Sequence, residues 1–184
     1  MKKIVPQAFF KTRVCNVESD DPNPYEWREL TTDEIFDGKK VVLFAVPGAF
    51  TPACSEVHLP GYESKYDAFR DLGVDTVICL AVNDAFVMFQ WAKSQDISNV
   101  FMLPDGNGEF SRKMGMLVDR SSQGMGMRSW RYSMYVDNGE IKRIFVEPDF
   151  QDNPPGVPVQ VSGADTMLSY LQDELGHSLE YINL

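Results

Sequence analysis

Cys54 follows a segment that prepares a cysteine for nucleophilic chemistry. Residues 41–46 form a continuous apolar run of the length expected for a strand buried on both faces of a sheet. Pro47-Gly48 ends this run. Thr51 is predicted to cap the following helix and Pro52 to be its first residue, so that Cys54 is the third. There the sulfur faces unpaired backbone N–H groups and the positive end of the helix dipole, which favour a thiolate, so we predict a reactive nucleophile rather than a packing residue.

The residues around Cys54 also resemble a known family. Residues 47–55, Pro-Gly-Ala-Phe-Thr-Pro-Ala-Cys-Ser, are similar to the active-site signature of the peroxiredoxins, thiol peroxidases that share the core Pro-x-x-x-Thr-x-x-Cys. The segments 56–62, 81–88 and 131–134 resemble the subgroup of atypical two-cysteine, plant type II and bacterial glutaredoxin-fused peroxiredoxins. The resemblance covers nearly the whole chain. It implies reduction of hydrogen peroxide and alkyl hydroperoxides through a sulfenic acid on Cys54, in antioxidant defence and redox homeostasis.

A thiolate that reduces peroxides also needs a fixed cation to align the peroxide and to stabilise charge on the leaving oxygen. A guanidinium is always charged and offers rigid donors. Arg131 is expected in the middle of a strand at 128–136, on the same face as Ser133. On pattern alone Arg128 is an alternative, but it would point to the opposite face, so only one of the two can reach Cys54. The resemblance assigns Arg131 as the active-site arginine and leaves Arg128 as a solvated edge-strand residue.

The resemblance implies three further site residues. The Thr51 hydroxyl would hydrogen-bond the peroxide, in addition to capping the helix. Pro47 would shield the sulfur from bulk water, and Gly48 would let backbone approach closely. The expected catalytic residues are therefore Pro47, Thr51, Cys54 and Arg131, and peroxide binding is expected from Gly48, Thr51, Cys54 and Arg131.

His58 suggests a different chemistry, that of a Cys-His hydrolase or acyl transferase. It lies four residues after Cys54 and thus one helical turn further along the same face, where it cannot easily reach a carbonyl bound at the sulfur. The only other histidine is His177. We therefore expect a structural role for His58. No nucleotide-binding glycine motif is present, the nine methionines are typical of core and loop positions, and we expect no metal or organic cofactor.

The remaining cysteines bear on how the sulfenic acid is reduced. Cys79 lies in an apolar strand and is expected to be a buried packing residue, whereas Cys15 has polar neighbours and is left open. Atypical two-cysteine members carry a resolving cysteine in the C-terminal half, but residues 147–163 contain none. We predict a one-cysteine cycle in which glutathione or a glutaredoxin reduces Cys54, with thioredoxin as the second choice. No Cys-x-x-Cys motif occurs, so such a partner is expected to be a separate protein.

Two other functions are compatible with the same residues. A thiol-based peroxide sensor or holdase would use identical chemistry at Cys54 and would differ in how quickly a physiological thiol returns it to the reduced state. A noncatalytic thioredoxin-fold binding module has no need for Thr51, Cys54 and Arg131 together. The peroxidase is therefore preferred.

Composition limits the class of protein. The chain of 184 residues, 43% apolar and 12% aromatic, predicts one domain spanning 1–184. A net charge of −10 argues against binding to nucleic acid or to an anionic membrane. No run approaches the ~18–20 apolar residues that span a bilayer, and the N-terminus does not resemble a signal peptide. Three irregularly spaced cysteines indicate a reducing compartment, so we expect a cytoplasmic protein.

The elements that position these residues follow from hydrophobic periodicity and turn signals. Strands are predicted at 5–17, 20–29, 41–46, 76–82, 100–103, 128–136 and 141–146, and helices at 31–34, from Cys54 onward, at 85–95, near 109–117 and from Ser162 onward. The helix from Cys54 is expected to kink at Pro60 and to carry Tyr62, Tyr66 and Phe69 on one side. The last helix is expected to open with a capping box at Ser162 and to bury Met167, Leu168, Leu171 and Leu175. Asn138-Gly139 predicts a hairpin and hence an antiparallel sheet edge. This order indicates a thioredoxin-like α/β fold, with a mixed central sheet flanked by helices and an N-terminal strand pair. Members of the subgroup often form homodimers through the active-site side, and Phe50, Phe86 and Phe89 are candidates for that contact.

Overall fold

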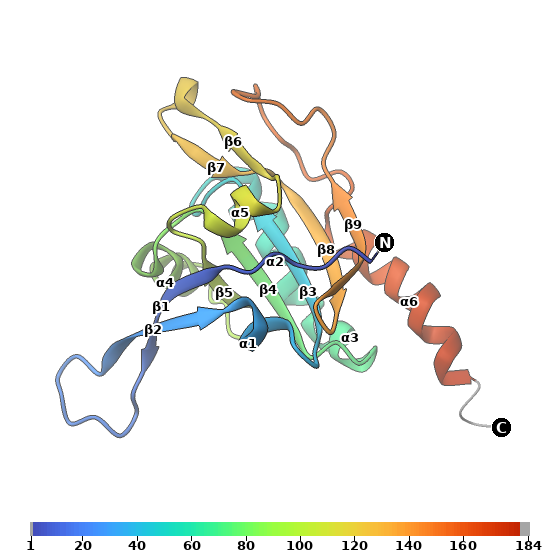
Figure 1. Cartoon of the computed structure of the whole chain (residues 1–184), viewed down its shortest axis with the longest axis horizontal. Coiled ribbons are helices and arrows are strands. Elements are labelled where there is room, and N and C mark those ends of the chain that lie inside the picture. Colours follow the sequence, from blue (N-terminus) through green and yellow to red (C-terminus); the bar gives the residue numbers. More distant parts are fainter. Residues whose placement is uncertain (1, 181–184) are drawn as a thin grey trace.

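The computed structural model describes residues 2–180, with side chains described up to residue 175. Its centre is a five-stranded sheet in the order β5-β4-β3-β8-β9 (Figure 1). The strands are β3 (Lys40–Val46), β4 (Thr76–Ala81), β5 (Phe101–Pro104), β8 (Tyr132–Asp137) and β9 (Glu140–Val146). β3, β4 and β5 are parallel, whereas β8 runs antiparallel to β3 and pairs with β9 through the hairpin at Asn138-Gly139. The predicted mixed sheet with an antiparallel edge is confirmed.

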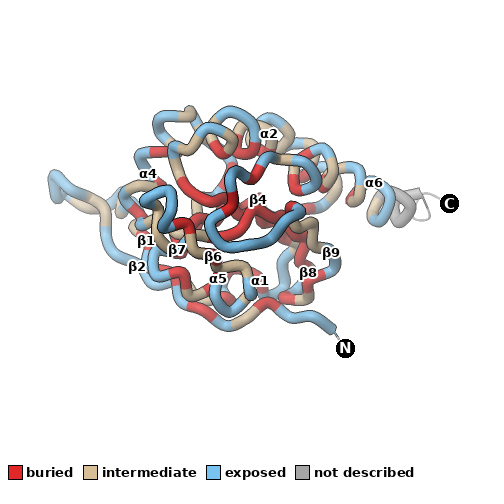
Figure 2. The backbone as a smooth tube through the Cα atoms, turned by 90° about the horizontal axis from the view of Figure 1, so that it is seen from above, coloured by how far each residue is buried: buried red, intermediate tan, exposed pale blue. Residues whose placement is uncertain are grey.

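β3 is apolar throughout because both of its faces are buried. Val42, Phe44 and Val46 belong to a core cluster on one face of the sheet, and Val41 and Leu43 belong to a second cluster on the other face. On the face of the first cluster pack a π-helical turn η1 (Cys54–His58) and the helices α2 (Leu59–Ser64), α3 (Tyr66–Asp71), α4 (Ala85–Ser94) and α6 (Ala164–Glu180). On the face of the second cluster pack α1 (Thr32–Phe36) and α5 (Glu109–Lys113). Buried backbone is accordingly concentrated between these layers (Figure 2).

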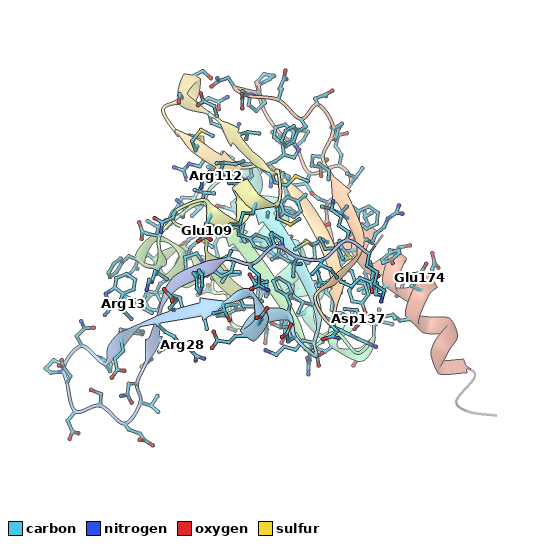
Figure 3. All side chains as sticks on the ribbon, in the orientation of Figure 1. Arg13, Arg28, Glu109, Arg112, Asp137 and Glu174 are labelled. Atoms are coloured by element: carbon cyan, nitrogen blue, oxygen red, sulfur yellow. The ribbon has the colours of Figure 1, made fainter. Side chains whose placement is uncertain are left out.

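The N-terminal strand pair is also present. β1 (Phe9–Cys15) and β2 (Tyr25–Thr31) form a two-stranded antiparallel sheet, and their connecting loop projects away from the central sheet (Figure 1). Arg13 and Arg28 are labelled on this hairpin, on the side of the molecule opposite Asp137 and Glu174 (Figure 3). The short helix predicted at 31–34 is present as α1, and Thr31 and Glu34 form a capping box at its start. No helix within residues 2–180 has both the length and the apolar character needed to cross a membrane.

The strand predicted at 128–136 is wrong, and the difference matters for the site. β7 (Met127–Ser129) pairs with β6 (Leu117–Asp119) after the short helix η2 (Ser121–Gln123), and β8 begins only at Tyr132. Trp130 and Arg131 lie between the two strands and belong to neither. Arg131 is therefore not in mid-strand, and its direction is not set by the alternation of a strand.

Two helix predictions also need correction. The helix after Cys54 is divided at Lys65 into α2 and α3, so Tyr62 and Phe69 are buried from two helices, while Pro60 lies at the start of α2. The last helix starts at Ala164, and Ser162 does not cap it. The Ser162 hydroxyl instead donates to the Glu147 carboxylate at 2.6 Å, a contact that joins the start of this helix to the end of β9.

Candidate active site

Cys54 lies where β3 passes into a helix. Pro47 and Gly48 are buried at the end of the strand, and the helix begins at Pro52, so Cys54 is its third residue as predicted. The first helical bond runs from Ser55 N–H to the Thr51 carbonyl at 3.0 Å. The Thr51 hydroxyl donates to the Gly48 carbonyl at 2.8 Å, and among the hydrogen bonds of the described residues no helix N–H donates to it, so the predicted side-chain cap is not formed.

The turn that carries Cys54 is π-helical. Leu59 N–H donates to the Cys54 carbonyl across five residues, and the π-helical turn covers Cys54–His58. Such turns are rare and occur frequently at functional sites. Residues 54–58 carry no sequence pattern that predicts this conformation. Its result is that Cys54 and His58 both point into the buried interior.

Arg131 is buried against Cys54. Its Nη2 donates to Cys54 Sγ at 3.4 Å, its Nη1 lies 3.0 Å from His58 Nδ1, and its Nε donates to the Val157 carbonyl at 2.9 Å. Arg131 is 2% exposed and Cys54 is 0% exposed. The guanidinium is thus held along two of its edges by neutral acceptors, and the remaining nitrogen faces the sulfur.

His58 is a neutral acceptor for this arginine. A guanidinium can only donate, so Nδ1 accepts from Arg131, and Nε2 carries the hydrogen that it donates to the Ser162 carbonyl at 2.9 Å. Burial, reinforced by the charge of Arg131, lowers the pKa of His58 to about 3. Neither ring nitrogen is free to take a proton from Cys54. These contacts agree with the predicted structural role of His58 and leave it no free nitrogen to act as the base of a Cys-His hydrolase.

Two further arginines lie near this pair. Arg128 does not extend into solvent as predicted, since it is half-buried and donates to the carbonyls of Met125 at 2.8 Å and Val82 at 3.1 Å. Arg120 was not predicted from the sequence. It is buried, and the charges of Cys54, Arg128 and Arg131 act on it. Burial lowers the pKa of Arg120. In a chain of net charge −10 the thiol therefore has one arginine in contact and two more in its vicinity.

Gly48 lies in close contact with the side chains of Met125 and Arg128. A Cβ atom at this position would lie 3.3 Å from Met125 Cε and 3.4 Å from Arg128 Nη1. The segment that approaches it is the loop before β7. Ala49 N–H is tied to the Asn83 side chain at 3.0 Å, so the backbone between β3 and η1 is held from both sides.

The other two cysteines lie in different surroundings. Cys79 is fully buried in β4 next to Phe44 of β3, which confirms its predicted packing position. Burial and the proximity of Cys54 raise the pKa of Cys79. Cys15 is exposed at the end of β1 opposite Tyr25. Within the described residues no group of three His, Cys, Asp or Glu side chains is arranged to hold a metal ion.

Comparison with known proteins gives consistent matches. The Redoxin family model matches residues 20–168. The chain is 60% identical over 168 residues to a peroxiredoxin of Synechocystis, covering 91% of this chain and 89% of the relative. Its structure is similar to the Plasmodium falciparum antioxidant protein, a 1-Cys peroxiredoxin, with a TM-score of 0.87, 35% identity and coverage of 94% and 99%. It is also similar to reduced Vibrio vulnificus Prx3 in complex with hydrogen peroxide, with a TM-score of 0.78, 37% identity and coverage of 93% and 98%.

These matches agree on the class defined by the sheet and the buried thiol, namely thiol-dependent peroxidases with a thioredoxin-like fold. The chain belongs to the peroxiredoxin family, in the subgroup that includes plant type II and bacterial peroxiredoxins. The predicted fold and the predicted thiol peroxidase function in antioxidant defence are thereby confirmed.

The low pKa of His58 predicts how stability depends on pH. Unfolded His58 titrates near 6.5, whereas the folded residue titrates at about 3. Between these values only the unfolded state binds the proton, so the free energy of unfolding falls as pH decreases, by up to about 1.4 kcal/mol per pH unit. Urea unfolding between about pH 6.5 and 5, above the range where most carboxylates titrate, measures this slope.

The control separates His58 from other groups. The variant His58→Gln should show a shallower dependence over this range, and His177→Gln, which removes the only other histidine, should keep the steep one. Equal slopes for His58→Gln and the parent chain would contradict the assignment.

Proposed function

We propose that Cys54 is the peroxidatic nucleophile and that Arg131 is the cation that acts on the peroxide. The observation that carries this proposal is the buried contact of Arg131 Nη2 with Cys54 Sγ at 3.4 Å. The Cys54 thiolate attacks one peroxide oxygen, an S–O bond forms as the O–O bond breaks, and the leaving alkoxide or hydroxide takes up a proton. The cysteine becomes a sulfenic acid, and the peroxide is reduced to an alcohol or water.

The neighbouring residues support this reaction by position. Arg131 offers rigid donors beside the sulfur, where negative charge passes from sulfur to the leaving oxygen. The Thr51 hydroxyl donates its hydrogen bond to the Gly48 carbonyl. The hydroxyl oxygen is therefore left to accept a hydrogen bond from the peroxide. Pro47 is buried next to this turn and limits access of water to the sulfur. These roles for Pro47, Gly48, Thr51 and Arg131 are part of the proposal.

The roles of the two arginines are tested by matched substitutions. Arg131→Met should lower the second-order rate constant for hydrogen peroxide about 100- to 1,000-fold, because it removes the donor to the leaving oxygen. Arg128→Met should have a smaller effect, because that guanidinium donates to the carbonyls of Met125 and Val82. Stopped-flow tryptophan fluorescence measures the oxidation rate. Equal losses in the two variants would overturn the assignment of Arg131.

For reduction of the sulfenic acid we propose the one-cysteine cycle. Cys79 is buried and its pKa is raised, so it is held as a weakly nucleophilic thiol. Cys15 lies on the hairpin that projects from the sheet. A glutathione thiol would condense with the sulfenic acid to give a mixed disulfide and water, and a second thiol or a glutaredoxin would release Cys54. The Plasmodium relative is named a 1-Cys peroxiredoxin.

The charge around the site supports glutathione over thioredoxin. Arg120, Arg128 and Arg131 form a cationic cluster near Cys54, and glutathione is a small thiol with two carboxylates. A folded protein thiol would need a larger opening, since the sulfur is 0% exposed. A cycle of this kind needs a reducing compartment, in line with the predicted cytoplasmic location.

Intact-mass measurement after one equivalent of peroxide tests the cycle. We expect a gain of one oxygen that is absent in Cys54→Ser, followed by conversion to a glutathione adduct when glutathione is added. Cys15→Ser and Cys79→Ser should behave like the parent chain. Loss of two hydrogens would instead indicate an internal disulfide. A sulfenic acid that persists with glutathione, glutaredoxin and thioredoxin present would favour the peroxide sensor or holdase.

We also propose a homodimer that uses the aromatic surface near the site. Phe50, Phe86 and Phe89 are 56%, 52% and 46% exposed, and removal of such rings from water favours association. Phe86 packs edge-on against Trp27, so the surface extends to the N-terminal hairpin. Phe86→Glu should shift the sedimentation coefficient from dimer to monomer. A monomer mass that is independent of concentration in the parent chain would refute the dimer.

A further inference from the structure

Glu147 is a buried carboxylate that the reaction at Cys54 does not use. It follows β9 directly and is 1% exposed. Its Oε1 accepts the N–H groups of Gln160 at 2.9 Å, Val161 at 3.0 Å and Ser162 at 2.9 Å, and the Ser162 hydroxyl at 2.6 Å. Burial of a carboxylate is costly unless its lone pairs are satisfied. Here three backbone N–H groups and one hydroxyl donate to Oε1, and the Val161 N–H also lies 3.3 Å from Oε2. No ion pair of Glu147 occurs among the described residues.

These bonds close a long loop. After β9 the chain extends away from the sheet and returns to the start of α6 (Figure 1). Glu147, at the first residue of this excursion, binds the backbone of its last part at residues 160–162. The carboxylate therefore sets where the returning segment lies relative to the sheet.

The returning segment holds Arg131, which contacts Cys54, and His58, which contacts Arg131. The Val157 carbonyl accepts from Arg131 Nε at 2.9 Å, and the Ser162 carbonyl accepts from His58 Nε2 at 2.9 Å. Glu147 also acts through its own backbone, because its N–H donates to the Arg131 carbonyl at 3.1 Å. Arg131 is thus connected to Glu147 through the main chain and through the loop.

Loss of these acceptors would affect the direction of the guanidinium. With Nε held by Val157 and Nη1 held by His58, only one orientation directs Nη2 to the sulfur. If the Ser162 carbonyl moved away, His58 would no longer be held as the tautomer with hydrogen on Nε2. A hydrogen on Nδ1 would then oppose a donor of Arg131 with another donor.

We propose that Glu147 is a positioning residue of the peroxidase, which holds the loop carbonyls at 157 and 162 and thereby keeps Arg131 directed at Cys54. This role rests on the function proposed above for Cys54 and Arg131. Glu147 does not touch the reacting atoms. It acts through the loop, His58 and Arg131.

A double-mutant cycle with Arg131 tests the proposal. Glu147→Ala should lower the second-order rate constant for hydrogen peroxide by about 10- to 100-fold in the parent chain, the cost of a misplaced catalytic group. In an Arg131→Met background the same change should cost less than about threefold, because there is no guanidinium left to position. Equal factors in the two backgrounds, or no loss in the parent chain, would overturn the proposal.

Further variants distinguish a positioning effect of Glu147 from a general loss of folded structure. Glu147→Gln keeps a carbonyl oxygen at Oε1, so it should retain the rate within about threefold. Glu140→Ala, at the other end of β9 in an ion pair with Lys142, should do so as well. Ser162→Ala removes only the hydrogen bond from the hydroxyl to Glu147. If Glu147→Ala does not fold, Ser162→Ala replaces it in the double-mutant cycle with Arg131→Met. If Arg131→Met alone leaves the rate constant unchanged, the proposed function itself fails. If Arg131→Met causes a large loss but Glu147→Ala or Ser162→Ala lowers the rate constant by the same factor with and without Arg131, only the role of Glu147 is refuted.

Discussion

The structure around Cys54 depends on a buried guanidinium that must be held by neutral groups. Within the described residues Arg131 has no carboxylate partner, and its nitrogens donate to a carbonyl, a neutral imidazole and the Cys54 sulfur. A carboxylate in contact with Arg131 would compete with a thiolate for its charge. The acidic group that the site does contain, Glu147, is held away by backbone donors. The positive charge therefore remains available to sulfur and to the oxygen that develops charge beside it.

Elements defined by local patterns were predicted well from the sequence. The apolar run that became β3, the Asn138-Gly139 turn and the short helix at 31–34 each depend on residues close together in the chain. The signature at 47–55 identified Cys54 and its place in the helix for the same reason. Arg131 was found by resemblance, and the argument from strand alternation was wrong, because the chain leaves the strand geometry at Trp130 and Arg131 to turn the guanidinium inward.

What could not be predicted depends on contacts between distant segments. Ser162 looks like a helix cap when only its neighbours are considered, yet a carboxylate fifteen residues away takes its hydroxyl. Glu147 and Arg120 carry no periodic signal of their own. In retrospect, the one indication for Glu147 is an acidic residue directly after the apolar end of β9, a position where solvent or a tight set of backbone donors must satisfy it. The π-helical turn likewise follows from packing and not from the composition of residues 54–58.

The same packing that directs Arg131 at Cys54 excludes a bulky reductant from the sulfur. Cys54 is 0% exposed, and His58, at the other end of the turn that carries Cys54, is part of the support for Arg131. A displacement of this turn that exposed the sulfur and carried His58 with it would therefore remove an acceptor from Arg131. The burial of the sulfur and the support of the cation thus depend on one short turn, whose π-helical bonding directs both Cys54 and His58 into the interior.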